Sequence, residues 1–138
     1  MNKGKKTVLF ICTHNSASSQ MTEGILNALY HDTYQAFSAG VSPSHVSPYA
    51  VEVLKEIGID ISDNRSKSIK EFQGSQFDYV ITVCDNAKET CPFFPGKKIL
   101  HKGFTDPANV NGSIDEILGT FRRVRDEIIA WIKKEFRD

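Results

Sequence analysis

Three cysteines, at positions 12, 84 and 91, are the residues best suited to chemistry in this chain of 138 residues. An odd number of cysteines excludes a fully paired disulfide framework, so these thiols are either buried spectators or reactive groups. Cys12 ends the apolar run that begins at Thr7, and small polar residues follow it. A thiol at the N-terminus of a helix is favoured as the nucleophilic thiolate. Cys12 is therefore the first candidate nucleophile.

The residues after Cys12 predict an oxyanion-binding loop. Backbone N–H groups between a strand and a helix lie at the positive end of the helix macrodipole, which favours a tetrahedral anion. Asn15 and Ser16 are expected to brace the loop, and His14 to add a donor or part of a charge. The residues predicted to surround the anion are Thr13, His14, Asn15, Ser16, Ala17, Ser18 and Ser19. The alternative is a polar turn that carries a structural cysteine.

Cys84 and Cys91 form a second group, at the end of a strongly predicted strand, 77–84. If residues 85–91 are helical, seven steps of about 1.5 Å separate the two Cα atoms by roughly 10 Å, whereas a disulfide needs about 4.4–6.8 Å. Pairing would require local unwinding, which a short polar segment before Pro92 allows at low cost. The alternative is two separate buried thiols.

Strands and helices alternate along the chain. The other predicted strands are 7–12, 34–38 and 97–100, and helices are predicted to begin at Ser19, Ser47–Pro48, Ser68 and Ser113, the last two with capping-box spacing to Glu71 and Glu116. This order predicts one α/β domain, 1–138, in three layers: a four-stranded, mostly parallel sheet with helices on both faces. Ligands bind such sheets at the carboxyl ends of strands, where Cys12 and Cys84 are expected.

Composition narrows the class of partner. Seventeen basic and seventeen acidic side chains leave a formal charge of zero, which gives no reason to expect nucleic acid or an anionic membrane as partner. The apolar run at Val8–Cys12 is far shorter than the roughly 20 residues of a membrane span, so we expect a soluble, cytoplasmic protein. The four histidines and three cysteines lack the paired spacings of zinc sites. No metal and no cofactor are predicted.

The loop sequence Cys-Thr-His-Asn-Ser-Ala-Ser-Ser-Gln (12–20) resembles the anion loop of low-molecular-weight protein tyrosine phosphatases and of the thioredoxin-coupled arsenate reductases that share their fold. The resemblance continues through Ser38-Ala-Gly40, Gly58–Ser62 and Gly103–Pro107 to the segment 122–127. It implies the same three-layer fold. The segment Cys84 to Cys91, followed by Pro92, is similar to the reductase segment that carries two further redox cysteines.

The resemblance to the reductases implies a three-cysteine relay. Cys12 would attack arsenate, with Asp106 as general acid; alternatively, the Asp106-Pro107 pair is only a turn. Cys84 would then attack Cys12 and release arsenite, and Cys91 would resolve the bridge so that thioredoxin or a similar thiol can reduce the Cys84–Cys91 disulfide. The alternatives are a low-molecular-weight phosphatase and a non-catalytic oxyanion-binding protein.

The sequence departs from the family pattern at position 18, where the family has arginine and this chain has serine. Arginine offers a charged, bidentate clamp to an oxyanion, and serine offers one neutral hydroxyl. We therefore expect impaired activity. Arg65 is the one candidate replacement, although an exposed loop cation is the alternative.

A second departure concerns the support of the loop. Some of the reductases bind potassium through residues that match Asn15, Glu23 and Ser38, together with an aspartate where this chain has Lys67. The Lys67 ammonium would take the place of that ion and steady the loop; the alternative is an ordinary solvated lysine.

Overall fold

The computed structural model describes residues 4–83, 94–105, 107 and 111–136. Its strands are β1 (Lys6–Cys12), β2 (Tyr34–Gly40), β3 (Phe77–Thr82) and β4 (Gly96–His101). Its helices are α1 (Ser18–Tyr30), α2 (Pro48–Lys55), the short 3-10 helix η1 (Ile69–Phe72) and α4 (Ile114–Glu135). These bounds agree with the predicted elements to within a few residues. Cys84, Cys91 and Asp106 lie outside the described residues.

The four strands form one parallel sheet in the order β2-β1-β3-β4. The chain passes from β1 to β2 on one side and later enters β3 on the other side of β1. The strand order therefore reverses beside β1, which is where open α/β sheets bind their ligands. Cys12 is the last residue of β1, at the carboxyl end of a strand as the sequence predicted, and it lies at this switch point.

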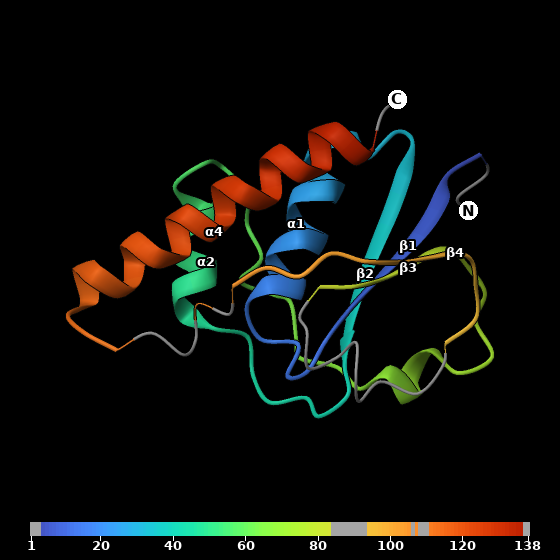
Figure 1. The fold of residues 1–138 in the computed structure, drawn as a ribbon, viewed down its shortest axis with the longest axis horizontal. Coiled ribbons are helices and arrows are strands. Elements are labelled where there is room, and N and C mark those ends of the chain that lie inside the picture. The colour runs from blue at the N-terminus through green and yellow to red at the C-terminus, as the bar shows by residue number, and fades with distance from the viewer. Residues whose placement is uncertain (1–3, 84–93, 106, 108–110, 137–138) are drawn as a thin grey trace.

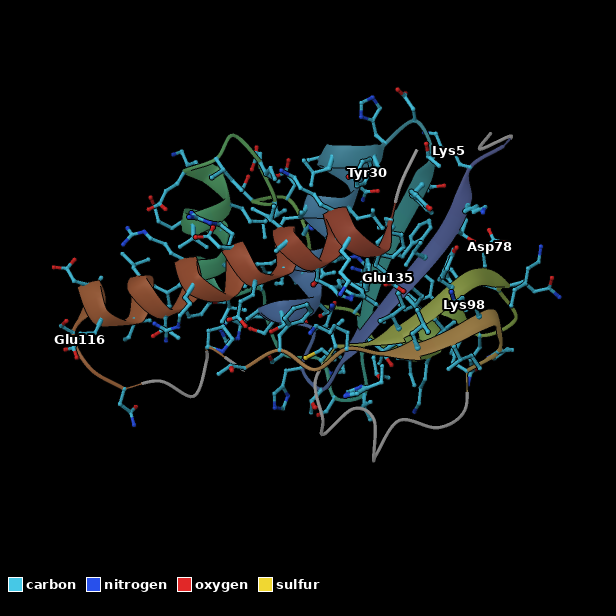
Figure 2. The ribbon with its side chains drawn as sticks, turned by 45° about the horizontal axis from the view of Figure 1, so that its top comes forward. Lys5, Tyr30, Asp78, Lys98, Glu116 and Glu135 are labelled. Carbon is cyan, nitrogen blue, oxygen red and sulfur yellow. The ribbon has the colours of Figure 1, made fainter. Side chains whose placement is uncertain are left out.

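Helices cover the sheet on two sides. Helices α1, α2 and α4 lie together on one side, and η1 lies on the other (Figure 1). Figure 2 shows α4 crossing the helical layer from Glu116, near its start, to Glu135, near its end. Phe10 on β1 meets Trp131 and Phe136 edge to face on the α4 side, while Phe37 on β2 meets Phe72 of η1. The predicted three-layer α/β architecture is confirmed.

The two predicted capping boxes differ in outcome. At α4, Ser113 Oγ accepts from the Glu116 N–H and the Glu116 side chain accepts from the Ser113 N–H. At η1, Ser68 Oγ instead accepts from the Lys70 N–H. The Glu71 carboxylate binds Arg65 rather than the Ser68 N–H. The capping box predicted at Ser68 is therefore wrong, because a bidentate ion pair holds its acidic member.

The helix predicted to begin at Ser47–Pro48 is α2, and Ser47 caps it only in part. Ser47 has the extended backbone of an N-cap residue and Pro48 occupies the first turn of α2, but the Ser47 side chain makes no capping hydrogen bond. The Ser47 N–H instead donates to the Ser16 carbonyl at 3.0 Å. This residue therefore also connects α2 to the loop that follows β1.

Candidate functional site

The loop between β1 and α1 is folded around Asn15. Asn15 is fully buried and has a left-handed backbone, with φ of 49°. Its Nδ2 donates to Ser19 Oγ at 2.8 Å, and its Oδ1 accepts from Gln20 Nε2 at 2.9 Å and from the Lys67 N–H at 2.8 Å. Asparagine tolerates this conformation better than most residues. Asn15 therefore braces the loop, as the sequence predicted.

The carbonyl groups of the loop are held by the segment that follows β2, residues 41–47, here called the bracing segment. Its N–H groups donate to four loop carbonyls in four bonds of 2.7–3.2 Å: Val41 to Cys12, Ser42 to Thr13, Ser44 to His14 and Ser47 to Ser16. In a trans peptide, the carbonyl of one residue and the N–H of the next point in opposite directions. The N–H groups of residues 13, 14, 15 and 17 are therefore expected to point away from the bracing segment.

Gly40 passes so close to this loop that no side chain fits. A Cβ atom on Gly40 would lie 2.8 Å from the Thr13 carbonyl oxygen and 2.9 Å from the Asn15 nitrogen, and both are backbone atoms. We predict that Gly40→Ala lowers the free energy of unfolding by about 1–3 kcal/mol and weakens binding of inorganic phosphate. Chemical denaturation and calorimetric titration measure the two effects.

Gly119→Ala is the matched control, because nothing lies within 4 Å of a Cβ at this position in α4. A glycine to alanine change inside a helix is expected to stabilise by roughly 0.5–1 kcal/mol. Equal changes in the free energy of unfolding and in phosphate affinity for the two variants would show that the close approach of Gly40 to the loop does not matter for either property.

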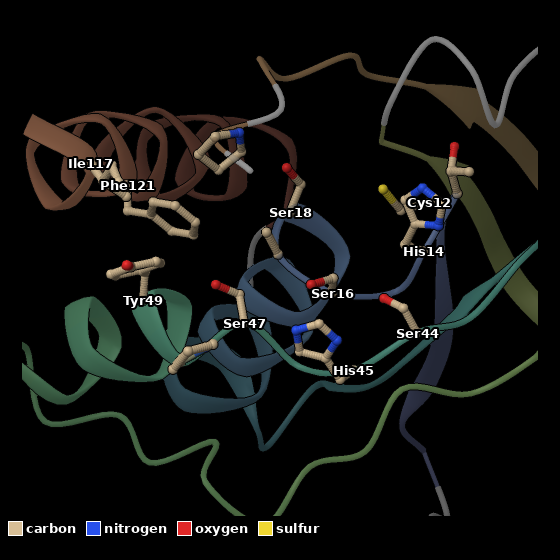
Figure 3. A pocket seen from close by; sticks show the side chains of 14 residues that line it. Cys12, His14, Ser16, Ser18, Ser44, His45, Ser47, Tyr49, Ile117 and Phe121 are labelled. Atoms are coloured by element: carbon tan, nitrogen blue, oxygen red, sulfur yellow. The ribbon is translucent and has the colours of Figure 1, made fainter. Parts of the chain in front are cut away.

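An open cavity of about 510 Å³ adjoins the loop. Figure 3 shows Cys12, His14 and Ser44 at one end of it and an apolar group, Tyr49, Ile117 and Phe121, at the other. Cys12 is 9% exposed. The described lining residues are Cys12, Thr13, His14, Ser16, Ala17, Ser18, Ser44, His45, Ser47, Pro48, Tyr49, Pro107, Ile117 and Phe121. The shape suits a nucleophile that attacks a ligand entering from solvent.

Ser18 is the first residue of α1 and lines the cavity with its side chain. It is 2% exposed, and its carbonyl accepts from Thr22 Oγ1 at 2.6 Å. The described lining of the cavity contains no Lys, Arg, Asp or Glu. Arg65 does not line it, because its guanidinium is bound to both carboxylate oxygens of Glu71 at 2.6 and 2.9 Å. Of the two readings of Arg65, the exposed loop cation is the one observed.

The three predicted support residues lie together behind the loop. Ser38 Oγ donates to Glu23 Oε1 at 2.8 Å, and Lys67 Nζ lies 3.9 Å from the same oxygen. Lys67 Nζ also donates to the Arg65 carbonyl at 3.1 Å. Burial raises the pKa of Glu23, opposed by Ser38 and Lys67. Burial lowers the pKa of Lys67, opposed by Glu23. Lys67 is therefore not a freely solvated side chain.

We predict that Lys67→Met destabilises the protein by about 1–2 kcal/mol near pH 8 and by less near pH 5. The variant leaves Glu23 buried without its cation, so the pKa of Glu23 rises further. A carboxyl with a raised pKa contributes most stability while protonated and loses that contribution as the pH rises through the raised pKa. Urea denaturation at several pH values measures this. The exposed Lys70→Met is the control, and a pH-independent loss in Lys67→Met would contradict the prediction.

Sequence reasoning missed several residues of the cavity, above all His45, Tyr49 and Phe121. They come from the bracing segment, α2 and α4, and only the folded chain brings these elements beside Cys12. Pro107 lines the cavity, whereas Asp106, Cys84 and Cys91 lie outside the described residues. Within the described ranges, no three His, Cys, Asp or Glu residues are grouped to hold a metal. No helix in the described part of the chain is long and apolar enough to cross a membrane.

The chain resembles known proteins in both sequence and structure. The model of the low molecular weight phosphotyrosine protein phosphatase family matches residues 7–136. An arsenate reductase of Halalkalibacterium halodurans is 44% identical over 130 residues, which is 94% of each chain. The chain also resembles a solved arsenate reductase in its phosphate-binding state, at 29% identity and a TM-score of 0.78, over 94% of this chain and 95% of that one.

A thioredoxin-dependent arsenate reductase of Corynebacterium glutamicum is a further structural neighbour. It is 29% identical, with a TM-score of 0.65, and the match covers 99% of this chain and 66% of that one. The fold of the present chain is thus similar to that of proteins that carry these names.

Proposed function

The chain belongs to the low molecular weight phosphotyrosine protein phosphatase family, and we propose that it acts within that family as an arsenate reductase. The observation that carries the proposal is the loop itself. Cys12 lines a cavity at the start of a loop whose carbonyls accept hydrogen bonds from the bracing segment, which leaves the opposite side of those peptides for the N–H groups. The arsenate reductase of 44% identity supports arsenate as the oxyanion held there.

The first half of the proposed reaction transfers arsenic to the protein and then reduces it. The Cys12 thiolate attacks arsenic, an arsenic–oxygen bond breaks, and the oxygen leaves as water with Asp106 as proton donor. Pro107, which lines the cavity, supports that role for its neighbour. Cys84 then attacks the Cys12 sulfur. The sulfur–arsenic bond breaks, its electron pair stays on arsenic, and arsenite leaves a Cys12–Cys84 disulfide behind.

The second half restores the nucleophile. Cys91 attacks Cys84, frees Cys12 and leaves a Cys84–Cys91 disulfide for thioredoxin or a similar dithiol to reduce. Two facts support this relay: the thioredoxin-dependent structural neighbour, and the bond from the Val83 N–H to the Ile11 carbonyl at 2.9 Å. That bond sets the residue before Cys84 beside the residue before Cys12. Such a relay needs reduced thiols, which suits the cytoplasm.

Ser18 is proposed to limit the rate of this reaction. A guanidinium at the start of α1 would neutralise an oxyanion and bind two of its oxygens, and the hydroxyl of Ser18 does neither. The backbone N–H groups of the loop and the start of α1 remain, so we propose that the site keeps oxyanion binding and loses part of the stabilisation of the transition state. Lys67 is proposed to steady the loop in place of a potassium ion, from its position between Glu23 and the Arg65 carbonyl.

A phosphatase is the second candidate, favoured by the apolar end of the cavity. Tyr49 and Phe121 pack against each other with ring centroids 5.5 Å apart, and an aryl phosphate would rest its ring there while Cys12 attacks phosphorus. A phosphatase has no use for Cys84 and Cys91. It therefore predicts that Cys84→Ser and Cys91→Ser leave phosphomonoester hydrolysis intact. A binding protein without turnover is the remaining alternative.

A single-turnover thiol count tests the reductase directly. Fully reduced protein is incubated with arsenate and no reductant, free thiols are titrated, and any bridge is mapped by mass spectrometry. We expect the count to fall from three to one per chain, with Cys84 bridged to Cys91. Three thiols that survive long incubation would overturn the proposal and leave the phosphatase or the binding protein.

A further inference from the structure

The cavity beside Cys12 has two side chains able to carry a positive charge in its described lining, His14 and His45. Resting on the proposed function, we propose that these two imidazoles form an oxyanion-binding pair that replaces part of the charge missing at Ser18. The ligand class is a tetrahedral oxyanion, held by backbone N–H groups of the loop on one side and by one or two imidazolium groups at the rim. Binding then depends on the protonation of histidine.

His14 is fixed in an orientation that suits this role. Its Nδ1 lies 3.0 Å from the Ser42 carbonyl oxygen. A carbonyl only accepts, so Nδ1 carries a proton and Nε2 is the nitrogen that gains or loses one. The ring itself is exposed at the cavity. Protonation of Nε2 therefore creates a cation and a second donor without disturbing the bond that holds the ring.

His45 is attached to the same part of the loop through Ser44. The Ser44 N–H lies 3.1 Å from the His14 carbonyl and 3.0 Å from Ser66 Oγ, and Ser66 Oγ donates to that carbonyl at 2.7 Å. These bonds fix where the bracing segment crosses the loop. In Figure 3 the rings of His14 and His45 both lie along the cavity near Ser44. An anion above the loop would therefore meet both rings.

None of the other titratable groups described around the pair supplies an unpaired positive charge to the anion. Cys12 on the loop and Tyr49 on α2 line the same cavity. On its far side, His45 borders a second cavity with Arg65, whose charge is paired with Glu71. The charge of Arg65 is thus already paired. His14 and Cys12 lie at the same end of the cavity (Figure 3), and a cationic imidazole beside a thiol favours the thiolate.

The test measures anion binding without turnover. Sulfate serves as the probe, because it is tetrahedral and its charge is constant between pH 6 and pH 8. Calorimetric titration is carried out on reduced wild-type protein, on His14→Gln, His45→Gln and the double variant, and on the exposed His31→Gln as control. Each is repeated with Cys12→Ser, which removes titration of the thiol. We expect the double variant to lose about tenfold in sulfate affinity at pH 6 and less than twofold at pH 8.

A second set of titrations tests whether the two imidazoles and an arginine at position 18 bind the same anion. With Ser18→Arg in place, the same histidine changes should cost less than about threefold at pH 6, because two groups that serve one anion are not additive. Loss of affinity that is equal at both pH values, or unchanged by Ser18→Arg, would overturn the proposal, and so would no loss at all.

The outcome is separable from that of the proposed function. If arsenate consumes thiols but the histidine variants bind sulfate as wild type does, the proposed reductase activity is supported and the proposed histidine pair is wrong. If sulfate binding depends on the histidines but all three thiols survive incubation with arsenate, the histidine pair is supported and the proposed reductase activity is wrong. The intact fold of each variant is checked by its unfolding midpoint, which the exposed positions of both rings are expected to leave unchanged.

Discussion

Replacing Ser18 with arginine is expected to raise kcat/KM for arsenate by on the order of 10²–10⁴. The side chain of residue 18 lines an open cavity of about 510 Å³ at the start of α1, so a longer side chain has room beside Cys12. A guanidinium there would add a permanent charge and two parallel hydrogen bonds to an oxyanion. Arsenite release under steady-state conditions with an excess of thioredoxin measures the gain.

Ser18→Lys separates charge from geometry, because lysine supplies a cation without the planar fork. We expect it to recover a smaller part of the rate than arginine does. The direction of the Ser18→Arg result also discriminates among the functions. A gain confined to phosphomonoester hydrolysis would identify a phosphatase. A protein that gains neither activity, while binding phosphate more tightly, would be an oxyanion-binding protein.

The part of the site that is local in sequence was predictable from the sequence. Cys12 ends a buried strand and Asn15 lies within the next three residues, so a strand-loop-helix pattern was enough to place both. Glu23, Ser38 and Lys67 came from the family resemblance, and the structure brings these three side chains together. These contacts confirm that the three side chains lie together, and their support of the loop is a proposal.

The rest of the site depends on contacts between distant segments. The bracing segment holds four loop carbonyls through backbone N–H groups, which any residue except proline can supply, so its sequence carries no signature of that task. Phe121 reads as a core residue of an amphipathic helix, and it is one, although it also closes the apolar end of the cavity. Gly40 was named only as the end of the segment Ser38-Ala-Gly40, and its close approach to the loop backbone is seen in the structure alone.

The second large effect is expected from Cys91→Ser. If Cys91 resolves the Cys12–Cys84 bridge, the variant completes the reduction of one arsenate per chain and then stops, because the nucleophile stays in a disulfide that thioredoxin is not positioned to reduce. We expect a burst of one arsenite per chain and a steady-state rate at least about 10²-fold below wild type. Rapid-quench measurement of arsenite gives both values, and mass spectrometry identifies the trapped bridge.

Cys84→Ser is the matched variant, because it removes the thiol that is proposed to attack Cys12 and release arsenite. It should release no arsenite in the first turnover, and Cys12 should be neither free nor bridged while arsenate is present. The two serine variants therefore differ by one equivalent of arsenite, although neither turns over. Equal bursts in both would show that Cys84 and Cys91 are interchangeable, which a fixed order of attack forbids. Multiple turnovers in Cys91→Ser would mean that the reductant attacks the Cys12–Cys84 bridge itself, and the third cysteine would then be a spectator.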